Sequence, residues 1–187
     1  YEKKPVWQLD YDMSPKEIVR LIDFRYLTDA LKPEEALEIL ENSSADKENR
    51  LSILMDEGYP CYNTSAGWLG YSDEKLYELC VTAKKSGFSH LKFKVGKDLN
   101  DDIRRLKIAR KAIGTDVRIM IDANQVWEVD EAIEWIKELE FADPFFIEEP
   151  TSPDDIAGHK KIKDAIQPIK VATGEMCQNR IIFKQFI

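Results

Sequence analysis

LKFKVGKDLNDDIRRLKIARKAIGTDVRIMID, residues 91–122, is the stretch that decides the fold. Two short runs rich in β-branched and other apolar residues, 91–95 and 117–122, flank a charged amphipathic run at about 101–113 that is long enough for a helix. A strand, a helix and a second strand in this order typically form a parallel pair joined by a crossover helix. We therefore predict a β–α–β unit.

The same alternation continues on both sides of this unit. We expect further strands at 61–65, 145–148 and 169–173, and further helices at about 72–87, 130–139 and 156–166. Five strands with crossover helices predict an α/β fold that is part of a TIM-type (β/α)8 barrel. Such a barrel needs eight units and typically about 250 residues, so we expect residues 61–187 to hold its N-terminal part, about five βα units, and to leave it open.

The first 60 residues have a helical pattern instead. Ser14 supplies an N-cap hydroxyl, Pro15 occupies the first helical position and Glu17 completes a capping box, so a helix is predicted to run to about residue 26. Further helices are expected at 33–41 and 46–57. The sequence thus predicts a helical lead-in over residues 1–60, associated with a capping region, before the barrel segment 61–187.

Composition narrows the function classes. The chain has 187 residues, and its 43% of hydrophobic residues is typical of a soluble globular protein. Its net charge of -8 and pI near 5.0 would repel the phosphate backbone of a nucleic acid. Cys61, Cys80 and Cys177 form no CxxC pair, so neither a zinc cage nor a disulfide framework is indicated. No apolar run reaches the roughly 18 residues of a membrane span. We expect no nucleic-acid or membrane partner.

Charged residues stand at four predicted strand ends, where the apolar pattern does not explain them. They are Lys92 and Lys94, Asp122 with Asn124, Glu148 with Glu149, and Glu175. The spacing is 28 residues from Lys94 to Asp122, 26 from Asp122 to Glu148 and 27 from Glu148 to Glu175. Each spacing is close to the length of one βα unit, roughly 30 residues. We therefore expect each site at the same level of successive strands, at the barrel mouth.

This arrangement indicates a metal site and a base. Three converging carboxylates repel one another unless a cation joins them, and oxygen ligands suit Mg²⁺, so Asp122, Glu148 and Glu175 are predicted ligands. Close to a divalent cation and a second lysine, the ammonium form of Lys94 is disfavoured, which makes it the candidate base. The metal and Lys92 would stabilise the enediolate formed when a proton leaves the carbon next to a carboxylate.

At these residues the sequence resembles a known family. KFK (92–94), IDAN (121–124), IEEP (147–150) and TGE (173–175) resemble the mandelate racemase branch of the enolase superfamily, which uses a Lys or His base with magnesium. Longer stretches, GWLGYSDEKL (67–76), FKVGKDLNDDIRR (93–105), IDANQVW (121–127), IEEPTSPDDIAGH (147–159) and NRIIFKQ (179–185), are similar to the L-fuconate dehydratases and their mitochondrial animal relatives. The resemblance covers nearly the whole chain.

The resemblance implies a role for each strand-end residue. Lys94 would be the acid/base lysine, Lys92 its carboxylate-binding neighbour, Asp122, Glu148 and Glu175 the Mg²⁺ ligands, and Asn124 and Glu149 residues that support them. It implies dehydration of an acid sugar, L-fuconate to 2-keto-3-deoxy-L-fuconate, in a possible homo-oligomer. It also implies a mitochondrial location; otherwise we expect a cytoplasmic one.

Two positions depart from the family pattern. The family pattern has a basic residue directly after IDANQ, but this chain has Val126 there, so its substrate preference is open. The family's second catalytic group, a histidine paired with an aspartate on later strands, has no counterpart before Ile187, and His90 and His159 match neither position. We assign these two histidines no role.

Other interpretations remain open from the sequence. The chain is alternatively a racemase or a dehydratase of another aldonate, or a non-catalytic binding or regulatory protein built on an incomplete barrel. Trp68 follows the first expected strand and is predicted to line the substrate pocket, although such residues more often cover a core. Unpaired strand edges predict association, so an isolated chain that stays monomeric with a cooperative melt would contradict the incomplete barrel.

Overall fold

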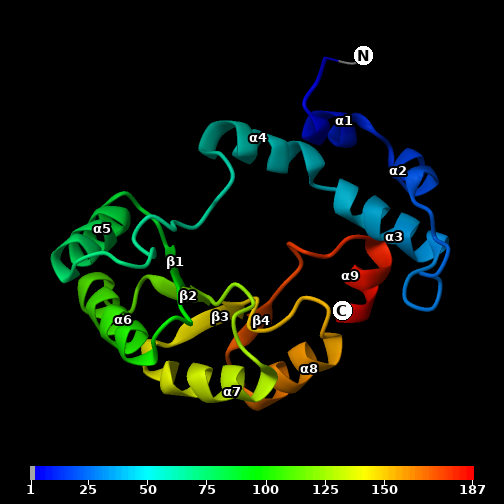
Figure 1. Ribbon diagram of the computed structural model, residues 1–187. Coiled ribbons are helices and arrows are strands. Elements are labelled where there is room, and N and C mark those ends of the chain that lie inside the picture. Colours follow the sequence, from blue (N-terminus) through cyan, green and yellow to red (C-terminus); the bar gives the residue numbers. More distant parts are fainter. Residues whose placement is uncertain (1–2) are drawn as a thin grey trace. The chain divides into compact units, whose positions relative to one another are not determined.

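The computed structural model describes residues 3–187 (Figure 1). It divides into two compact units, one formed by residues up to Tyr59 together with Gln178–Ile187, the other by Pro60–Cys177. The second unit carries every strand that the structure describes, and it contains all of the strand-end residues singled out above.

Pro60–Cys177 is built on a parallel sheet. Its strands are β1 (His90–Lys94), β2 (Arg118–Asp122), β3 (Pro144–Glu148) and β4 (Lys170–Ala172), in the spatial order β1-β2-β3-β4. The helices are α5 (Asp73–Lys85), α6 (Leu99–Ile113), α7 (Val129–Glu138) and α8 (Ile156–Ala165), with a 3-10 turn, η1, at Glu140–Ala142. Successive neighbours joined by helices are the βα alternation of a partial TIM-type barrel, as predicted.

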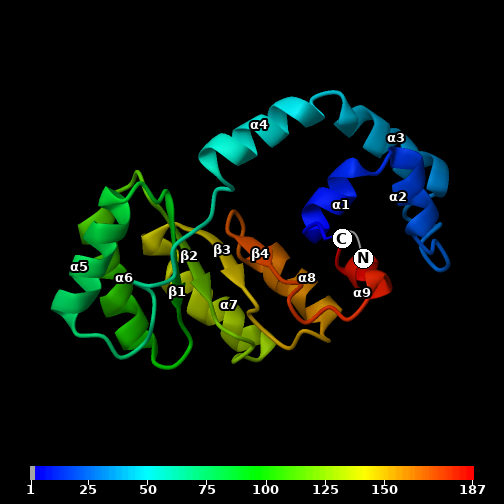
Figure 2. The same ribbon diagram turned by 90° about the horizontal axis from the view of Figure 1, so that it is seen from above.

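The helices lie on one face of this sheet (Figures 1 and 2). Side chains alternate along a strand, so Leu91 and Phe93 of β1 and Ile121 of β2 face the helices and are fully buried. They form the core with the apolar stripes of the helices, such as Leu106 of α6 and Ile136 of α7. The alternate residues, including both lysines of β1, lie on the opposite, inner face.

The strand register places three of the predicted site residues at one level. Lys94 pairs with Asp122, and Asp122 pairs with Glu148. Glu148 pairs in turn with Ala172, which lies three residues before Glu175. The spacing argument therefore holds for the first three strands, while Glu175 lies beyond the last paired position of β4.

One predicted strand is reduced to a single bridge. Residues 61–65 make one isolated parallel bridge, from Asn63 to Leu91, rather than a regular strand. The side chain of Asn63 accepts hydrogen bonds from the backbone and hydroxyl of Ser65, and Gly67 closes a turn onto Thr64. Local side-chain bonds of this kind compete with a β-ladder, which is why the β-prone pattern was misleading here.

The other unit is helical. It contains α1 (Val6–Asp12), α2 (Pro15–Leu21), α3 (Pro33–Ser44), α4 (Lys47–Glu57) and α9 (Arg180–Phe186). The capping box of Ser14 and Glu17 is present as predicted. However, α2 ends at Leu21 rather than near residue 26, because Asp23 accepts the backbone N–H of Arg25 and turns the chain. The short helices α1 and α9 were not predicted.

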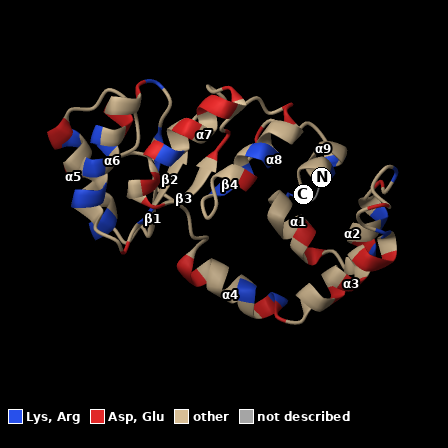
Figure 3. Cartoon of the chain, turned by 90° about the horizontal axis from the view of Figure 1, so that it is seen from below, with Lys and Arg blue, Asp and Glu red and all other residues tan. Residues whose placement is uncertain are grey.

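Charged residues are distributed along the helices. Acidic and basic residues are interspersed on α5 to α8 (Figure 3), typical of helices with one solvated face. Within residues 3–187, none of the helices is long and apolar enough to cross a membrane.

Candidate active site at the carboxyl ends of the strands

Lys92 joins two of the predicted metal ligands. Its Nζ lies 2.6 Å from Oε2 of Glu148 and 3.0 Å from Oδ2 of Asp122. Burial disfavours its ammonium form, but the hydrogen bonds to Glu148 and Asp122 outweigh this and hold the pKa of Lys92 above the ordinary lysine range. Lys92 therefore stays charged at neutral pH, which suits a group that binds a carboxylate.

Lys94 lies on the same face, one step nearer the end of the strand. Its Nζ is 2.7 Å from Oδ2 of Asp122 and 2.7 Å from Oδ1 of Asn124. About a quarter of its side chain is exposed, against 9% for Lys92. Of the two amines, that of Lys94 is therefore the more accessible to a small molecule, which is the requirement for a proton-transferring group.

Asp122 is at the centre of the cluster. It is 1% exposed, and both lysines donate to its Oδ2. Burial alone would raise the pKa of this carboxyl, but the hydrogen bonds from Lys94 and Lys92 hold it below the ordinary aspartate range. The second oxygen of Asp122 accepts the backbone N–H of Asn124 at 3.0 Å, which orients the carboxylate.

The backbone after β2 and β3 is held in unusual conformations. Asn124, Gln125 and Glu149 have φ values of 49°, 66° and 45° although none is glycine. Such left-handed residues cost roughly 1–2 kcal/mol each and persist where the surrounding bonds fix them. Here Gln125 donates its N–H to the carbonyl of Glu149, so the two turns support each other. Backbone strain of this kind is often found at active sites.

The glutamates differ in their surroundings. Glu149 is 4% exposed, and its Oε1 has no hydrogen-bond partner among the described residues. Glu175 is exposed, and nowhere in residues 3–187 do three acidic, histidine or cysteine side chains gather closely enough to hold a metal ion. Of the predicted ligands, Asp122 and Glu148 share one partner, because Nζ of Lys92 contacts both carboxylates.

Two aromatic rings flank the lysines. Nζ of Lys94 lies 5.8 Å from the ring centroid of Trp68, and Nζ of Lys92 lies 5.1 Å from that of Tyr62, within the range of cation–π attraction. A pocket of about 430 Å³ adjoins Lys94 and is lined by Trp68, Leu69 and Val126 among others. Its volume falls in the range of small-molecule sites.

The chain is similar in sequence to known proteins. The sequence pattern of the family described as enolase C-terminal domain-like matches residues 75–187, more than half of the chain. The chain is 54% identical to mitochondrial enolase superfamily member 1 of Xenopus laevis over 100% of its own length, and 53% identical to L-galactonate dehydratase of Hypocrea jecorina over 98%. It spans 42% of the length of each of these relatives.

Solved structures give the same result. The crystal structure of human mitochondrial enolase superfamily member 1 matches 98% of the chain with a TM-score of 0.92 at 52% identity, and the chain covers 42% of it. L-talarate/galactarate dehydratase from Salmonella typhimurium matches 81% of the chain with a TM-score of 0.64 at 31% identity, with 38% of that protein covered. The chain belongs to the enolase superfamily.

Sequence reasoning missed three residues that shape the site of this enolase-superfamily chain. Tyr62 lies in the segment predicted as a strand, and its ring lies under the amine of Lys92. Asp102 and Arg105 of α6 were given no role within the charged helix predicted at about 101–113, yet they are 0% and 1% exposed. Their positions, i and i+3 on the same stripe as Leu106, were the signal that they face the core.

Proposed function

We propose that this chain carries the metal site and one acid/base lysine of a sugar-acid dehydratase. The observation that carries the proposal is the convergence of Asp122 and Glu148 on one nitrogen of Lys92, with the more accessible Lys94 beside them. Because the chain spans 42% of its relatives, the activity is that of the whole protein.

The residues present fit Mg²⁺. Asp122 and Glu148 each offer a carboxylate oxygen to one cationic nitrogen at 2.6–3.0 Å, and all-oxygen donors with room for water suit this ion. We infer that Asp122, Glu148 and Glu175 hold the ion and that Asn124 and Glu149 support them. When bound, Mg²⁺ would supply Lewis-acid polarisation of the substrate carboxylate.

Lys94 is the proposed acid/base group. A neutral amine at Lys94 takes the proton from the carbon next to the carboxylate, and the electron pair left behind is delocalised onto the carboxylate as an enediolate. That pair then forms a double bond to the neighbouring carbon as the hydroxyl on that carbon leaves. The hydroxyl departs as water with a proton from Lys94 itself or from a second acid, and the enol becomes a 2-keto-3-deoxy acid. Lys92, which remains charged, holds the substrate carboxylate.

We infer L-fuconate as the substrate. L-Fuconate differs from L-galactonate in having a methyl group in place of the terminal hydroxymethyl group. The pocket next to Lys94 offers apolar surface from Leu69, Val126 and the ring of Trp68, and an apolar wall gains nothing from a hydroxyl that it cannot hydrogen-bond. The pocket therefore favours the methyl-terminated acid. We expect a ratio of kcat/KM values of about tenfold, because one small group in an apolar pocket changes this ratio by roughly 10–200-fold.

The activity is tested on the full-length protein with Mg²⁺ and either aldonate, by measuring formation of the 2-keto-3-deoxy acid. Lys94→Ala should lower kcat by at least about 100-fold, the usual contribution of a general acid or base. The matched control is Lys111→Ala, an exposed lysine at the far end of α6. Absence of product from every aldonate tried, with metal present, refutes the dehydratase proposal.

The metal site is tested separately, by the rise in melting temperature when Mg²⁺ is added to chelator-treated protein. Binding to the folded state alone stabilises it, by about 2.7 kcal/mol at 100 times the Kd. Asp122→Asn and Glu148→Gln should remove this rise. The control is Asp116→Asn, an exposed carboxylate two residues before β2 begins, at the other end of the strand from Asp122. An undiminished rise in both site variants refutes the ligand assignment.

We also infer that the protein acts in mitochondria. The support is that several relatives, 52–54% identical over the whole chain, are named mitochondrial enolase superfamily member 1. Fluorescence microscopy of the tagged full-length protein tests this, and diffuse cytoplasmic fluorescence would contradict it.

A further inference from the structure

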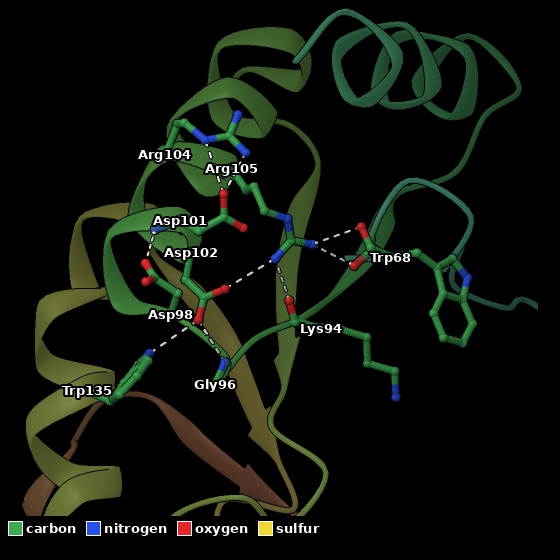
Figure 4. A network of polar contacts seen from close by, with 10 residues as sticks. Trp68, Lys94, Gly96, Asp98, Asp101, Asp102, Arg104, Arg105 and Trp135 are labelled. Atoms are coloured by element: carbon green, nitrogen blue, oxygen red, sulfur yellow. Dashed lines mark hydrogen bonds and ion pairs between the residues drawn. The ribbon is translucent and has the colours of Figure 1, made fainter. Parts of the chain in front are cut away.

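A buried ion pair on α6 lies directly behind the candidate active site. Asp102 is 0% exposed and Arg105 is 1% exposed, and Nη1 of Arg105 lies 3.2 Å from Oδ1 of Asp102. Both side chains point from the helix toward the carboxyl end of β1 (Figure 4). Neither residue is part of the lysine–carboxylate cluster described above.

Arg105 binds backbone carbonyls of two separate segments. It donates to the carbonyl of Lys94 at 2.7 Å, and to the carbonyls of Gly67 and Trp68 at 2.8 Å and 3.2 Å. Lys94 and Trp68 are thus held by one guanidinium, whose rigid planar fork fixes the angle between its bonds. Figure 4 shows the side chain of Lys94 extending from this anchored backbone.

Asp102 fixes the other side of the same strand end. Its Oδ2 accepts the backbone N–H of Gly96 at 2.7 Å and the indole N–H of Trp135 at 3.2 Å. The pair therefore holds the backbone two residues after Lys94 as well as Lys94 itself. Both ends of the short segment that carries the candidate base are tied to one turn of α6.

The segment that carries Trp68 also lies against β1 directly. The carbonyl of Gly67 accepts the N–H of Lys94 at 2.9 Å as well as the bond from Arg105. Across this contact, the amine of Lys94 lies over the ring of Trp68. The backbone bonds of Arg105 thus set the spacing between the lysine and the aromatic wall of the pocket.

Stability alone does not account for this pair. Burial is costly for both groups: it raises the pKa of Asp102 and lowers that of Arg105. Buried ion pairs are often replaced by apolar residues with no loss of stability. Apolar residues cannot supply the five directed hydrogen bonds that this pair makes to backbone and indole groups, three of which hold the backbone of Lys94, Gly67 and Trp68.

We propose that Asp102 and Arg105 are positioning residues that hold Lys94 and Trp68 at a fixed separation across the substrate pocket. The proposal rests on the proposed function for its catalytic consequence. Its structural part is independent of any activity: the backbone at 67–68 and at 94–96 moves as one piece because one ion pair holds both.

The test uses the full-length protein and the conservative variant Arg105→Lys, which keeps the charge but loses the planar fork. Arg104→Lys is the matched control, since Arg104 is next in the chain and pairs with Asp73 and Asp101 at the surface. Backbone amide hydrogen exchange is followed for peptides covering 64–70 and 93–97. Arg105→Lys should speed exchange in both by at least about tenfold, and Arg104→Lys in neither.

A kinetic readout separates positioning from loss of structure. In Arg105→Lys, kcat for dehydration should fall about 10- to 100-fold, because a misplacement of about 1 Å can cost that much. The concentration of Mg²⁺ giving half-maximal activity should stay within about twofold, since Asp122 and Glu148 are not among the partners of Arg105. Asp102→Asn should likewise speed hydrogen exchange in both peptides and lower kcat.

Two results overturn the proposal. One is unchanged exchange in both peptides with Arg105→Lys. The other is a fall in kcat no larger than the fraction of unfolded protein explains. If the wild-type protein dehydrates no aldonate, the proposed function fails, and hydrogen exchange still decides: faster exchange in both peptides supports the positioning pair, and exchange like that of Arg104→Lys refutes it.

Discussion

Replacement of Gly67 by alanine is the sharpest test of the close contact between the Trp68 segment and β1. A methyl group on Gly67 would lie 2.7 Å from Cα of Phe93 and 2.8 Å from the carbonyl carbon of Lys92, and closer still to the Lys92 carbonyl oxygen. All three are backbone atoms, which no side-chain rotation can move. The segment and the strand must therefore separate in Gly67→Ala.

Separation has a calculable cost. The carbonyl of Gly67 loses a neutral hydrogen bond from Lys94, roughly 1 kcal/mol, and a charge-assisted one from Arg105, roughly 2 kcal/mol. Overpacking adds about 1–3 kcal/mol. We therefore expect Gly67→Ala to lower the free energy of unfolding by about 4–6 kcal/mol.

Gly70→Ala is the control. Gly70 has a φ of +82° and open space around its Cα, so alanine there costs only the strain of a left-handed conformation, about 1–2 kcal/mol. Urea unfolding of both variants of the full-length protein, followed by tryptophan fluorescence, gives the two values. Equal losses for Gly67→Ala and Gly70→Ala would refute the close approach of the two backbones.

Two further predictions rest on the burial of Asp102 and Cys80, and a third rests on the pocket wall formed by Trp68. Burial raises the pKa of Asp102, so the folded state binds the proton of this carboxyl more tightly than the unfolded state does. The free energy of unfolding should therefore fall as pH rises from about 3.9 through the raised pKa. The difference in urea midpoint between wild type and Asp102→Asn should change with pH over that range and be constant at higher pH. Burial raises the pKa of Cys80 to about 12, so iodoacetamide at pH 8 should label exposed Cys61 and leave Cys80 unlabelled in native protein, as mass spectrometry would show; equal labelling would contradict the buried thiol. Trp68→Ala should raise KM for the aldonate about tenfold with a smaller change in kcat, measured by initial rates, because an aromatic wall binds ground and transition state alike; a loss confined to kcat would contradict that role.

The sequence predicts the regular parts of the barrel segment well. Period-two alternation in β1 and the 28- and 26-residue steps placed Lys94, Asp122 and Glu148 at one level, and the register confirms this. These inferences succeed because the pleat and the βα repeat are set by local chemistry. The same spacing argument does not extend to Glu175, which follows the three-residue strand β4 in an irregular segment.

What the sequence does not predict depends on tertiary contacts. Asn63 makes one bridge to β1, and the chain turns directly after it, where the side chain of Asn63 accepts the N–H of Ser65; β propensity does not predict such a turn. Charged Asp102 and Arg105 resemble solvated helix residues until carbonyls from two other segments approach them. The roles of the strand-end residues stay predictions, since they concern a reaction rather than a fold.

The contacts of α9 have a consequence for biosynthesis. Arg180 donates to the backbone of Asp23, and Lys184 pairs with Asp29, so the helical unit is closed by partners 157 and 155 residues apart in the chain. Closing a loop of that length costs about 4.5 kcal/mol of chain entropy, apart from a constant. The intervening residues 60–177 are synthesised before α9 and contain their own core. On the ribosome, the parallel sheet can therefore form while the earlier-made helices still wait for their C-terminal partner.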